Sequence, residues 1–309
     1  MYEDNRENIQ KMKKVLIIGC GLLGSSLVRK ISKKKIAKKI FIYEKSKLNI
    51  AKIKKLKLSG KIVKSLKEGV INSQLIIVCT PMSEYKKLIL KINKYISPET
   101  LITDIGSSKI GSSKVITKFL KKGIHWTRSH PITGSEVSGP EHGKYNMFDN
   151  KWCVLIKDKK TNLKHLRFLD TFWKKLGSKT VIMNSEKHDK IFSITSHLPH
   201  LIAYNLVKSA QDFEKILMFD LIKYSAGGLR DFSRIAASNE IMWRDIFFDN
   251  KINLSKAIDL FIKNLNAFKK DINSNNNRSI LKKLIKTKKV RSKIIKLKQD
   301  TDKPDFGRS

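Results

Sequence analysis

The sequence predicts two domains: an α/β domain with a doubly wound, mainly parallel sheet, followed by an all-α C-terminal domain. A short β-branched run at Val15–Ile18 leads directly into a glycine-rich turn, as a buried parallel strand does before a helix. Apolar strand-like runs then alternate with helical patterns up to about residue 184. Beyond it, the chain shows only helical periodicity to about residue 297. We therefore expect domains at 12–184 and 185–298, with a tail at 299–309.

The first strand is followed by the pattern Gly19-x-Gly21-x-x-Gly24, a helical pattern, and a second strand, Lys39–Tyr43, that ends at Glu44. This order, with the acid 20 residues after the last glycine, is typical of the Rossmann dinucleotide-binding fold. The first glycine allows the tight turn, and the second lets the backbone approach the pyrophosphate. The third allows close packing of helix and strand. The helix N-terminus then presents free N–H groups to the phosphates. A glycine turn that binds no cofactor is the alternative.

The residue after the second strand favours NAD over NADP. Glu44 can accept hydrogen bonds from both hydroxyls of the adenosine ribose and would repel a 2′-phosphate. Lys45 and Lys47 follow directly, so the preference is not absolute. The residues expected to contact the cofactor are Gly19, Gly21, Leu22, Leu23, Gly24, Glu44, Thr80 and Pro81.

Polar residues follow three further strand-like runs. Leu75–Cys79 ends at Thr80, Leu101–Asp104 opens into a loop with Ser107, and a third such run precedes a loop that holds His130. Ligands of open α/β sheets bind at the carboxyl ends of the strands, so we expect these three side chains to converge. The other predicted elements of the first domain are a helix at 84–96, a strand at 152–156, a helix at 162–176 and a strand at 180–183.

The helical half is expected to begin after Asn184, with Ser185 as the cap of its first helix. Ser225–Gly228 is interpreted as a flexible break before Arg234, and Asn273–Asn277 as a polar loop. The tail is expected to be disordered. Helical segments are predicted at 191–207, 213–224, 233–237, 242–248, 251–265 and 279–297, of which the last is strongly basic and suits packing on the domain, on a partner subunit or on an acidic surface.

Composition bounds the class of protein. The 309 residues are 40% hydrophobic, enough for a packed core. No apolar run reaches the roughly 18 residues of a membrane span, and Met1–Lys14 lacks the apolar core of a signal peptide. The sequence thus predicts a cytoplasmic protein. Cys20, Cys79 and Cys153 are far apart and lie in or beside apolar runs, so we expect buried thiols rather than a disulfide or a zinc site.

The formal net charge of +38 suggests a nucleic-acid-binding protein at first sight. However, the lysines are spread along the whole chain, and lysine greatly outnumbers arginine, the usual base-reading residue. The abundance of Ile, Asn and Lys would also follow from an AT-rich genome, which we weigh more heavily. In either case a positive surface attracts anionic ligands.

Several separated motifs, in order, resemble the prephenate/arogenate (cyclohexadienyl) dehydrogenases of tyrosine biosynthesis, from about Val15 to Phe248. Where Ser135 and Ser233 stand, the family commonly has threonine, which keeps the hydroxyl. The motifs are the glycine loop at 19–24, Asp104-x-Gly106-Ser107-x-Lys109, Ser129-His130-Pro131-Ile132-x-Gly134-x-Glu136-x-Ser138-Gly139, Ser196-His197-Leu198-Pro199-His200, Arg230-Asp231-Phe232-Ser233-Arg234-Ile235-Ala236 and Met242-Trp243-Arg244-Asp245.

The resemblance implies an NAD-dependent oxidative decarboxylation. Hydride leaves C4 of prephenate, the ring carboxylate leaves as CO2, and 4-hydroxyphenylpyruvate forms; arogenate would give tyrosine. His130 is implied as the acceptor of the C4 hydroxyl proton, a task that suits a neutral imidazole near pH 7. Ser107 is implied beside the nicotinamide, where it could hydrogen-bond the same hydroxyl or His130. A homodimer is also implied, and it would cover the apolar helices of the second half.

The resemblance also implies substrate contacts from the second half. Arg234 can hold a carboxylate through two donors, with Asp231 one turn earlier to orient it. His200 is expected to reach the substrate, while Glu136 and Trp243 order the pocket. His197, three residues before His200, would also suit a metal site, but no Asp or Cys at ligand spacing joins them, and no metal is expected.

Other interpretations stay open on the residues alone. His130 could be an ordinary loop residue, and Arg234 could form a surface ion pair. A β-hydroxyacid-type dehydrogenase is the rival among enzymes, although that class places a catalytic lysine in the helical domain. A basic nucleic-acid-binding protein is the rival from another class. The choice between prephenate and arogenate and inhibition by tyrosine are open, and the remaining histidines, His188 among them, are interpreted as ordinary.

Overall fold

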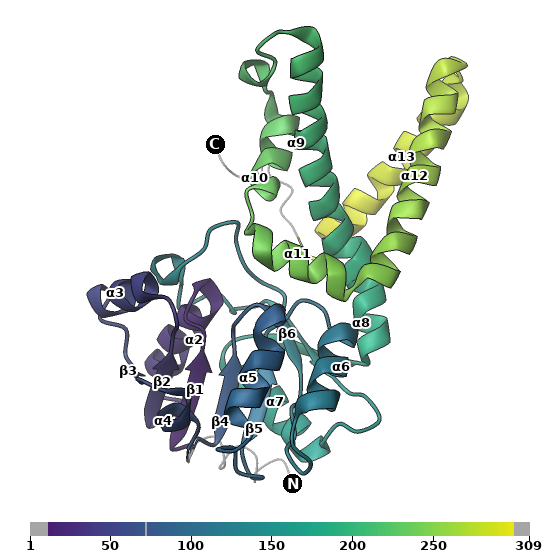
Figure 1. The fold of residues 1–309 in the computed structure, drawn as a ribbon. Coiled ribbons are helices and arrows are strands. Elements are labelled where there is room, and N and C mark those ends of the chain that lie inside the picture. Colours follow the sequence, from purple (N-terminus) through teal and green to yellow (C-terminus); the bar gives the residue numbers. More distant parts are fainter. Residues whose placement is uncertain (1–11, 72, 300–309) are drawn as a thin grey trace.

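A computed structural model describes residues 12–71 and 73–299 (Figure 1). The predictions for the N-terminal residues before Met12 and for the tail after Gln299 lie outside the described residues. Within the described ranges, none of the helices is long and apolar enough to cross a membrane.

The first half is built on a five-stranded parallel sheet with the order β3-β2-β1-β4-β5. This is the order of the nucleotide-binding half of a doubly wound sheet, so the predicted fold class is confirmed. The strands are β1 (Lys14–Ile18), β2 (Lys39–Tyr43), β3 (Lys61–Ile62), β4 (Leu75–Val78) and β5 (Leu101–Asp104).

Both faces of this sheet are buried, which explains why β1 is apolar at successive positions. Val15 and Ile17 belong to a core that includes α2 and α7, whereas Leu16 and Ile18 belong to a second core with α4, α5 and α6. Helices therefore cover the sheet on both sides (Figure 1). They are α2 (Leu22–Lys33), α3 (Lys47–Lys55), α4 (Leu66–Val70), α5 (Tyr85–Ile92, preceded by the 3₁₀ turn η1, Met82–Glu84), α6 (Ile110–Phe119) and α7 (Leu163–Lys175).

A second sheet of three strands adjoins β5 through an isolated bridge between Ile102 and Trp126. Its members are β6 (Ser129–Pro131), β7 (Trp152–Ile156) and β8 (Lys179–Met183), and a 3₁₀ turn, η2 (Pro140–His142), lies between the first two. The prediction of His130 in a loop after a strand was wrong, because His130 lies inside β6, paired antiparallel with Val154. Ser-His-Pro carries no apolar alternation, and Pro131 is accommodated because β6 is an edge strand.

The second half is entirely helical in the described residues, as predicted. Figure 1 shows two helical hairpins, α9 with α10 and α12 with α13, that diverge above α8 and α11. The elements are α8 (Ser185–Phe192), the π-helical turn η3 (Ser193–His197), α9 (Leu198–Leu217), the 3₁₀ turn η4 (Ile222–Tyr224), α10 (Gly227–Ala236), α11 (Glu240–Asp249), α12 (Lys251–Asn273) and α13 (Asn277–Lys296).

Three local predictions for this half need correction. Asn184, rather than Ser185, caps α8 by accepting a hydrogen bond from the Lys187 N–H. The glycines of the expected break are the first two residues of α10, so Arg234 lies in the last turn of that helix and does not open it. Gly227 and Gly228 each have open space where a Cβ would stand, so crowding by neighbouring atoms does not require glycine there.

Large apolar side chains remain uncovered on the helical half. The buried core there is small, with Leu198, Leu254 and Ala257 at its centre. By contrast, Phe213 is 56% exposed, Ile252 63% and Leu265 55%. Exposed apolar surface of this extent on two neighbouring hairpins is typical of a surface that a protein partner covers.

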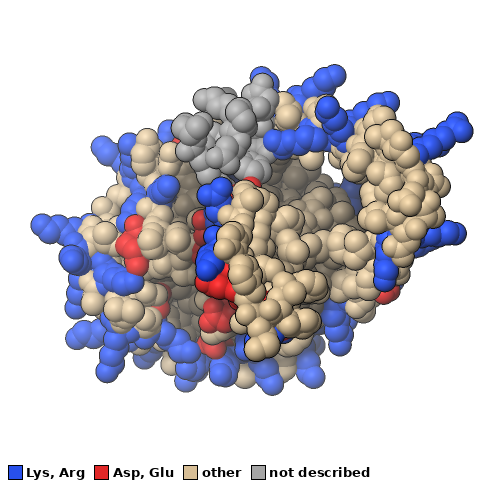
Figure 2. Space-filling model, turned by 90° about the horizontal axis from the view of Figure 1, so that it is seen from above, with Lys and Arg blue, Asp and Glu red and all other residues tan. Residues whose placement is uncertain are grey.

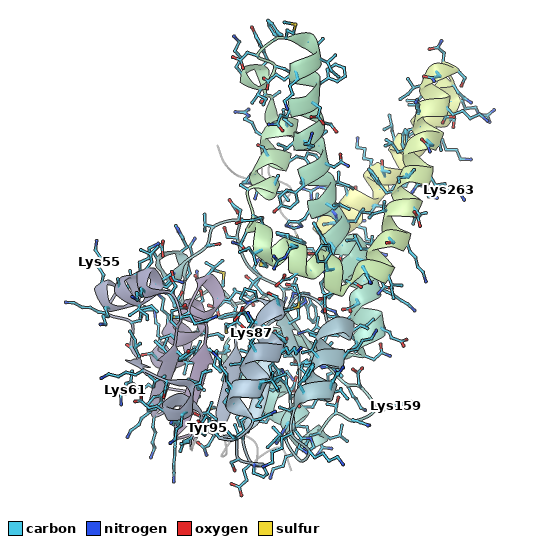
Figure 3. The ribbon with its side chains drawn as sticks, in the orientation of Figure 1. Lys55, Lys61, Lys87, Tyr95, Lys159 and Lys263 are labelled. Carbon is cyan, nitrogen blue, oxygen red and sulfur yellow. The ribbon has the colours of Figure 1, made fainter. Side chains whose placement is uncertain are left out.

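Positively charged side chains occur on elements throughout the described part of the chain. Figure 2 shows lysines and arginines at many points around the outline of one face, with most of the visible carboxylates nearer its middle. The labelled lysines of Figure 3 point outward from α3, β3, α5, the β7–α7 loop and α12. This distribution favours a general compositional bias over one nucleic-acid-binding block. The three cysteines are free, with Cys20 and Cys153 buried as predicted and Cys79 partly buried.

Candidate active site

The glycine loop between β1 and α2 has the geometry that close approach of a ligand requires. Gly19 has a φ of +88°, a left-handed conformation that favours glycine. A Cβ on Gly24 would lie 2.1 Å from the Gly19 carbonyl oxygen, so only glycine allows α2 to pack this closely. A Cβ on Gly21 would meet nothing within 4 Å, which leaves open space beside the loop. The first turn of α2 has no side-chain cap and no acidic residue, so its N–H groups are available to an anion.

Glu44 and Thr80 flank this loop. The Glu44 carboxylate accepts hydrogen bonds from the Cys20 N–H (2.7 Å) and the Ser46 N–H (2.9 Å), which places it beside the glycine loop. Thr80 follows β4, and its methyl group would lie 3.2 Å from a Cβ on Gly19. The Thr80 hydroxyl is buried and has no hydrogen-bond partner among the described residues. A dinucleotide fits these features, since a buried hydroxyl without a partner is costly unless a ligand satisfies it.

A buried ion pair fixes the loop between β5 and α6 that holds Ser107. Lys109 Nζ lies 2.7 Å from Asp104 Oδ2, and both side chains are fully buried. The same oxygen accepts from the Tyr85 hydroxyl (3.1 Å) and the Gly106 N–H (3.0 Å). A Cβ on Gly106 would crowd Asp104 at 2.9 Å, so glycine is needed there. Ser107, half-buried, sits between these anchored positions.

The same ion pair ties this loop to the strand that holds His130. Lys109 Nζ donates a hydrogen bond to the Ser129 carbonyl (2.8 Å), and the Ser129 hydroxyl donates to the Asp104 carbonyl (2.7 Å). These bonds join residues that lie 20 or more positions apart in the chain. The backbone next to His130 is therefore held against the backbone next to Ser107.

His130 is buried against histidine and phenylalanine side chains of α8. Its Nδ1 atom lies 2.8 Å from Nε2 of His188, and its ring centroid lies 4.9 Å from that of Phe192. Burial lowers the pKa of His130 well below its usual value, and the charges of His188 and Lys109 act in the same direction. A histidine with a lowered pKa is neutral near pH 7 and can accept a proton.

Two aspartates of the helical half bind the N-terminal end of α6. Asp189 accepts hydrogen bonds from the N–H groups of Lys109 (2.9 Å) and Ile110 (2.8 Å). Asp249 accepts from the Ser108 hydroxyl and from the Ser112 N–H (3.3 Å). Carboxylates are favoured at helix N-termini, so these contacts dock the helical half onto the α/β half beside Ser107. Burial raises the pKa of both carboxyl groups.

The π-helical turn places two histidines close to α11. The His200 ring stacks on the Trp243 ring with centroids 3.7 Å apart, and its Nδ1 donates to the Ser196 carbonyl (2.9 Å). The Trp243 indole N–H is buried and has no partner within the described part of the chain. Burial lowers the pKa of His197 to about 4, against the opposite effects of the Asp189 charge and the Ser107 backbone. Such turns often mark functional positions in helices.

Arg234 pairs across the two halves. Its guanidinium lies 3.7 Å from Glu136 Oε2, and the side chains are 43% and 31% exposed. The pairing thus joins two of the predicted substrate-contact residues. Asp231, expected to orient Arg234, is three residues earlier on α10, and that role stays a prediction. Over the described residues, no group of three or more His, Cys, Asp or Glu side chains is placed to hold a metal ion.

The structure thus brings the predicted residues together in four groups. Glu44 and Thr80 flank the glycine loop, and the strand of His130 is bonded to the Ser107 loop. His200 stacks on Trp243 in the helical half, and Arg234 pairs with Glu136 across the two halves. Sequence reasoning missed His188, Asp189 and Asp249. The adjacent His-Asp pair in α8 was the only local signal, because their partners lie up to 141 positions away in the chain.

Taken together, the fold and these groups define a nucleotide-binding α/β domain with a helical domain docked at the carboxyl edge of its sheet. Residues 27–182 match the family model for the prephenate dehydrogenase nucleotide-binding domain, and residues 184–287 match that for the prephenate dehydrogenase dimerization domain. The chain belongs to the prephenate/arogenate dehydrogenase family of oxidoreductases, which acts in tyrosine biosynthesis.

Individual relatives agree with this assignment. The chain is 29% identical to a cyclohexadienyl dehydrogenase of Zymomonas mobilis over 290 residues, which cover 94% of this chain and 98% of the relative. It is 30% identical to a prephenate dehydrogenase of Bacillus subtilis over 82% of this chain and 69% of the relative. The crystal structure of a prephenate dehydrogenase from A. aeolicus in complex with hydroxyphenyl propionate and NAD+ superposes with a TM-score of 0.84 and 32% identity, over 92% of this chain and 99% of that one.

Proposed function

We propose that this protein is a prephenate dehydrogenase, which converts prephenate to 4-hydroxyphenylpyruvate by NAD-dependent oxidative decarboxylation. Arogenate, alone or beside prephenate, is the alternative substrate, since relatives of similar identity are named cyclohexadienyl and prephenate dehydrogenase. The observation that carries the proposal is the buried His130, whose lowered pKa makes it a neutral base and whose strand is bonded to the Ser107 loop.

NAD is the cofactor that the residues present fit. The glycine loop, the first turn of α2, Glu44 and the unpartnered Thr80 hydroxyl would hold it, with Leu22, Leu23 and Pro81 beside them. When bound, NAD supplies the acceptor for the hydride that leaves C4. A relative with a TM-score of 0.84 was crystallised with NAD+, which supports this choice of cofactor.

The protein's own part in the reaction is to take a proton and to bind an anion. His130 accepts the proton of the C4 hydroxyl, so that the carbon–oxygen bond gains double-bond character as hydride leaves and CO2 is released. Ser107 hydrogen-bonds the same hydroxyl and orients it. Arg234 binds a carboxylate of the substrate. His200, which stacks on Trp243, contacts the substrate from the helical half as well. Glu136 pairs with the Arg234 guanidinium in the absence of substrate, and a substrate carboxylate takes the place of Glu136 when it binds.

The two halves divide this work. We propose that residues 12–184 bind the cofactor, and that residues 185–298 bind the substrate and form a homodimer. The exposed apolar side chains of α9 and α12 and the match to a dimerization domain support the dimer. No role for a nucleic acid is proposed, because the lysines are spread along the whole chain and do not form a single block on the face that Figure 2 shows.

A direct assay tests the proposed function. NADH formation is followed by absorbance with prephenate and with arogenate, each in the presence of NAD or NADP. We expect turnover of prephenate with NAD. Turnover of arogenate alone would establish the alternative substrate, and no turnover of either would contradict the proposal. Retention on DNA that weakens with salt, in the absence of any turnover, would favour the nucleic-acid-binding alternative.

Replacing Glu44 with serine is expected to erode the preference for NAD over NADP. The Glu44 carboxylate lies beside the glycine loop, where it would repel a 2′-phosphate. The ratio of kcat/KM for the two cofactors measures the change. Glu44→Gln is the matched control, because it keeps an acceptor for the Cys20 N–H and removes only the charge. Equal or better use of NADP by the unmodified protein would defeat this prediction.

Arg234→Ala is expected to raise KM for the substrate, with NAD affinity unchanged. Truncating a residue that binds a desolvated carboxylate costs about 2–5 kcal/mol, and we expect the lower end because the Arg234 side chain is 43% exposed. A loss of about 2 kcal/mol corresponds to a roughly thirtyfold rise in KM. Arg234→Lys keeps the charge without the two-donor geometry and should give a smaller rise. A normal KM in the alanine variant would remove Arg234 from the site.

A further inference from the structure

Three buried side chains form a continuous hydrogen-bonded chain that ends at His130. Asp189 Oδ1 lies 2.7 Å from His188 Nδ1, and His188 Nε2 lies 2.8 Å from His130 Nδ1. Asp189 and His188 are completely buried, and His130 is 8% exposed. The first two lie side by side on α8, in the helical half, whereas His130 lies on β6 in the α/β half. The chain therefore crosses from one half to the other.

The backbone of α6 decides which atoms of this chain carry protons. Both Asp189 oxygens accept hydrogen bonds from backbone N–H groups, Oδ1 from Lys109 and Oδ2 from Ile110. A backbone N–H can only donate, so the Asp189 carboxylate acts as an acceptor at both oxygens and must also accept from His188. The proton of His188 is accordingly on Nδ1, and Nε2 is left as an acceptor.

The position of the proton on His188 also determines which ring nitrogen of His130 carries a proton. His188 carries a single proton, because burial lowers its pKa to about 2 and the positive charges of Lys109, His197 and Arg128 act in the same direction. Its Nε2 can therefore only accept, and His130 must donate from Nδ1. A neutral His130 with its proton on Nδ1 has no proton on Nε2. That second ring nitrogen is the one able to accept a proton from a substrate.

We propose that His188 and Asp189 are positioning residues, which hold His130 as the tautomer with its proton on Nδ1 and so keep Nε2 available as the base. This inference rests on the proposed function in so far as His130 is the proton acceptor. When the hydroxyl O–H bond of the substrate breaks and an N–H bond forms at Nε2, His130 becomes an imidazolium ion. Its Nδ1–H then makes a charge-assisted bond to His188, which in turn is bonded to the Asp189 carboxylate.

This bond strengthens only as positive charge develops, so its loss should affect kcat rather than KM. We expect His188→Leu to lower kcat roughly ten- to a hundredfold, the worth of one hydrogen bond to a charged group, with KM and NAD affinity nearly unchanged. In His188→Gln the side-chain oxygen can accept from His130 Nδ1, and part of the loss should be recovered. His165→Gln, on α7 and outside the site, is the control and should leave kcat unchanged.

Unfolding midpoints of each variant show whether a lower kcat reflects loss of the fold. A merely structural role for His188 would lower the midpoint without a selective effect on kcat, and glutamine would restore nothing. Full kcat in a folded His188→Leu variant would overturn the proposal.

A second measurement needs no substrate. In protein with nitrogen-15-labelled histidine, the ring nitrogens of a neutral histidine report directly which of the two carries the proton. We expect a protonated Nδ1 and an unprotonated Nε2 for His130, and the same for His188, with the His130 pattern lost in His188→Leu. A proton on Nε2 of His130 in the unmodified protein would overturn the proposal. If the unmodified protein turns over neither substrate, the proposed function fails, while this spectrum still decides the tautomer.

Discussion

Replacing His130 with asparagine is expected to lower kcat by about a hundredfold or more, the usual worth of a positioned acid or base. Asparagine can still donate a hydrogen bond toward His188 Nε2 from its amide, but it has no nitrogen that accepts a proton at neutral pH. Binding of NAD and of the substrate should be kept, because neither depends on the base. Steady-state kinetics and a direct measurement of NAD binding check the two parts separately.

The pH dependence gives a further check of the same residue. Because burial lowers the pKa of His130, its basic form is present at neutral pH, and kcat/KM should fall only as the pH drops through that lowered pKa. This acidic limb should be absent from whatever residual activity the asparagine variant has. If kcat barely changes in His130→Asn, the residue is structural and the proton goes elsewhere.

The second large effect is expected for stability. Lys109→Met removes one partner of a fully buried ion pair and leaves the Asp104 carboxylate without its counter-charge. Breaking such a pair costs about 3–5 kcal/mol of unfolding free energy. Lys109 also donates to the Ser129 carbonyl, so the strand that holds His130 should shift and activity should fall as well. The urea midpoint of unfolding and kcat measure these effects.

The double variant Asp104→Asn, Lys109→Met is the matched control for the stability of the ion pair. Without the buried charge on residue 104, the loss of Lys109 should cost less than in the single variant. Equal midpoints for Lys109→Met and the unmodified protein would show that the buried pair contributes nothing to stability. A fall in activity alone would then place the role of Lys109 in the site, through its bond to Ser129.

Much of the α/β half could be predicted because its signals are local. The run Val15–Ile18 is apolar at each position, since both faces of β1 are covered, and it passes straight into glycines that a tight turn requires. Glu44 follows the next strand and does lie beside the glycine loop. Such features depend on residues that are neighbours in the chain, so the pattern alone determines them.

Apart from the cap of α8, which is a local feature, the predictions that failed concern contacts between distant residues. His130 was expected in a loop, because the pairing of β6 with β7 depends on residues about 25 positions later in the chain, Cys153–Leu155. His188 was expected to be ordinary, because its partner His130 is 58 positions away. Arg234 was expected to open a helix after a break, but Gly227 and Gly228 are themselves helical where α10 packs on α9.

The sequence by itself determined the alternation of strands and helices that defines the α/β half, the glycine loop, the acid beside it and the helical second half, because periodicity and turn chemistry depend on consecutive residues. Only the tertiary structure decided how the two halves meet. The N–H groups of α6 need acceptors, and Asp189 and Asp249 supply them from the helical half. The same docking places His188 beside His130, and no local sequence pattern predicts this contact because the two residues are 58 positions apart.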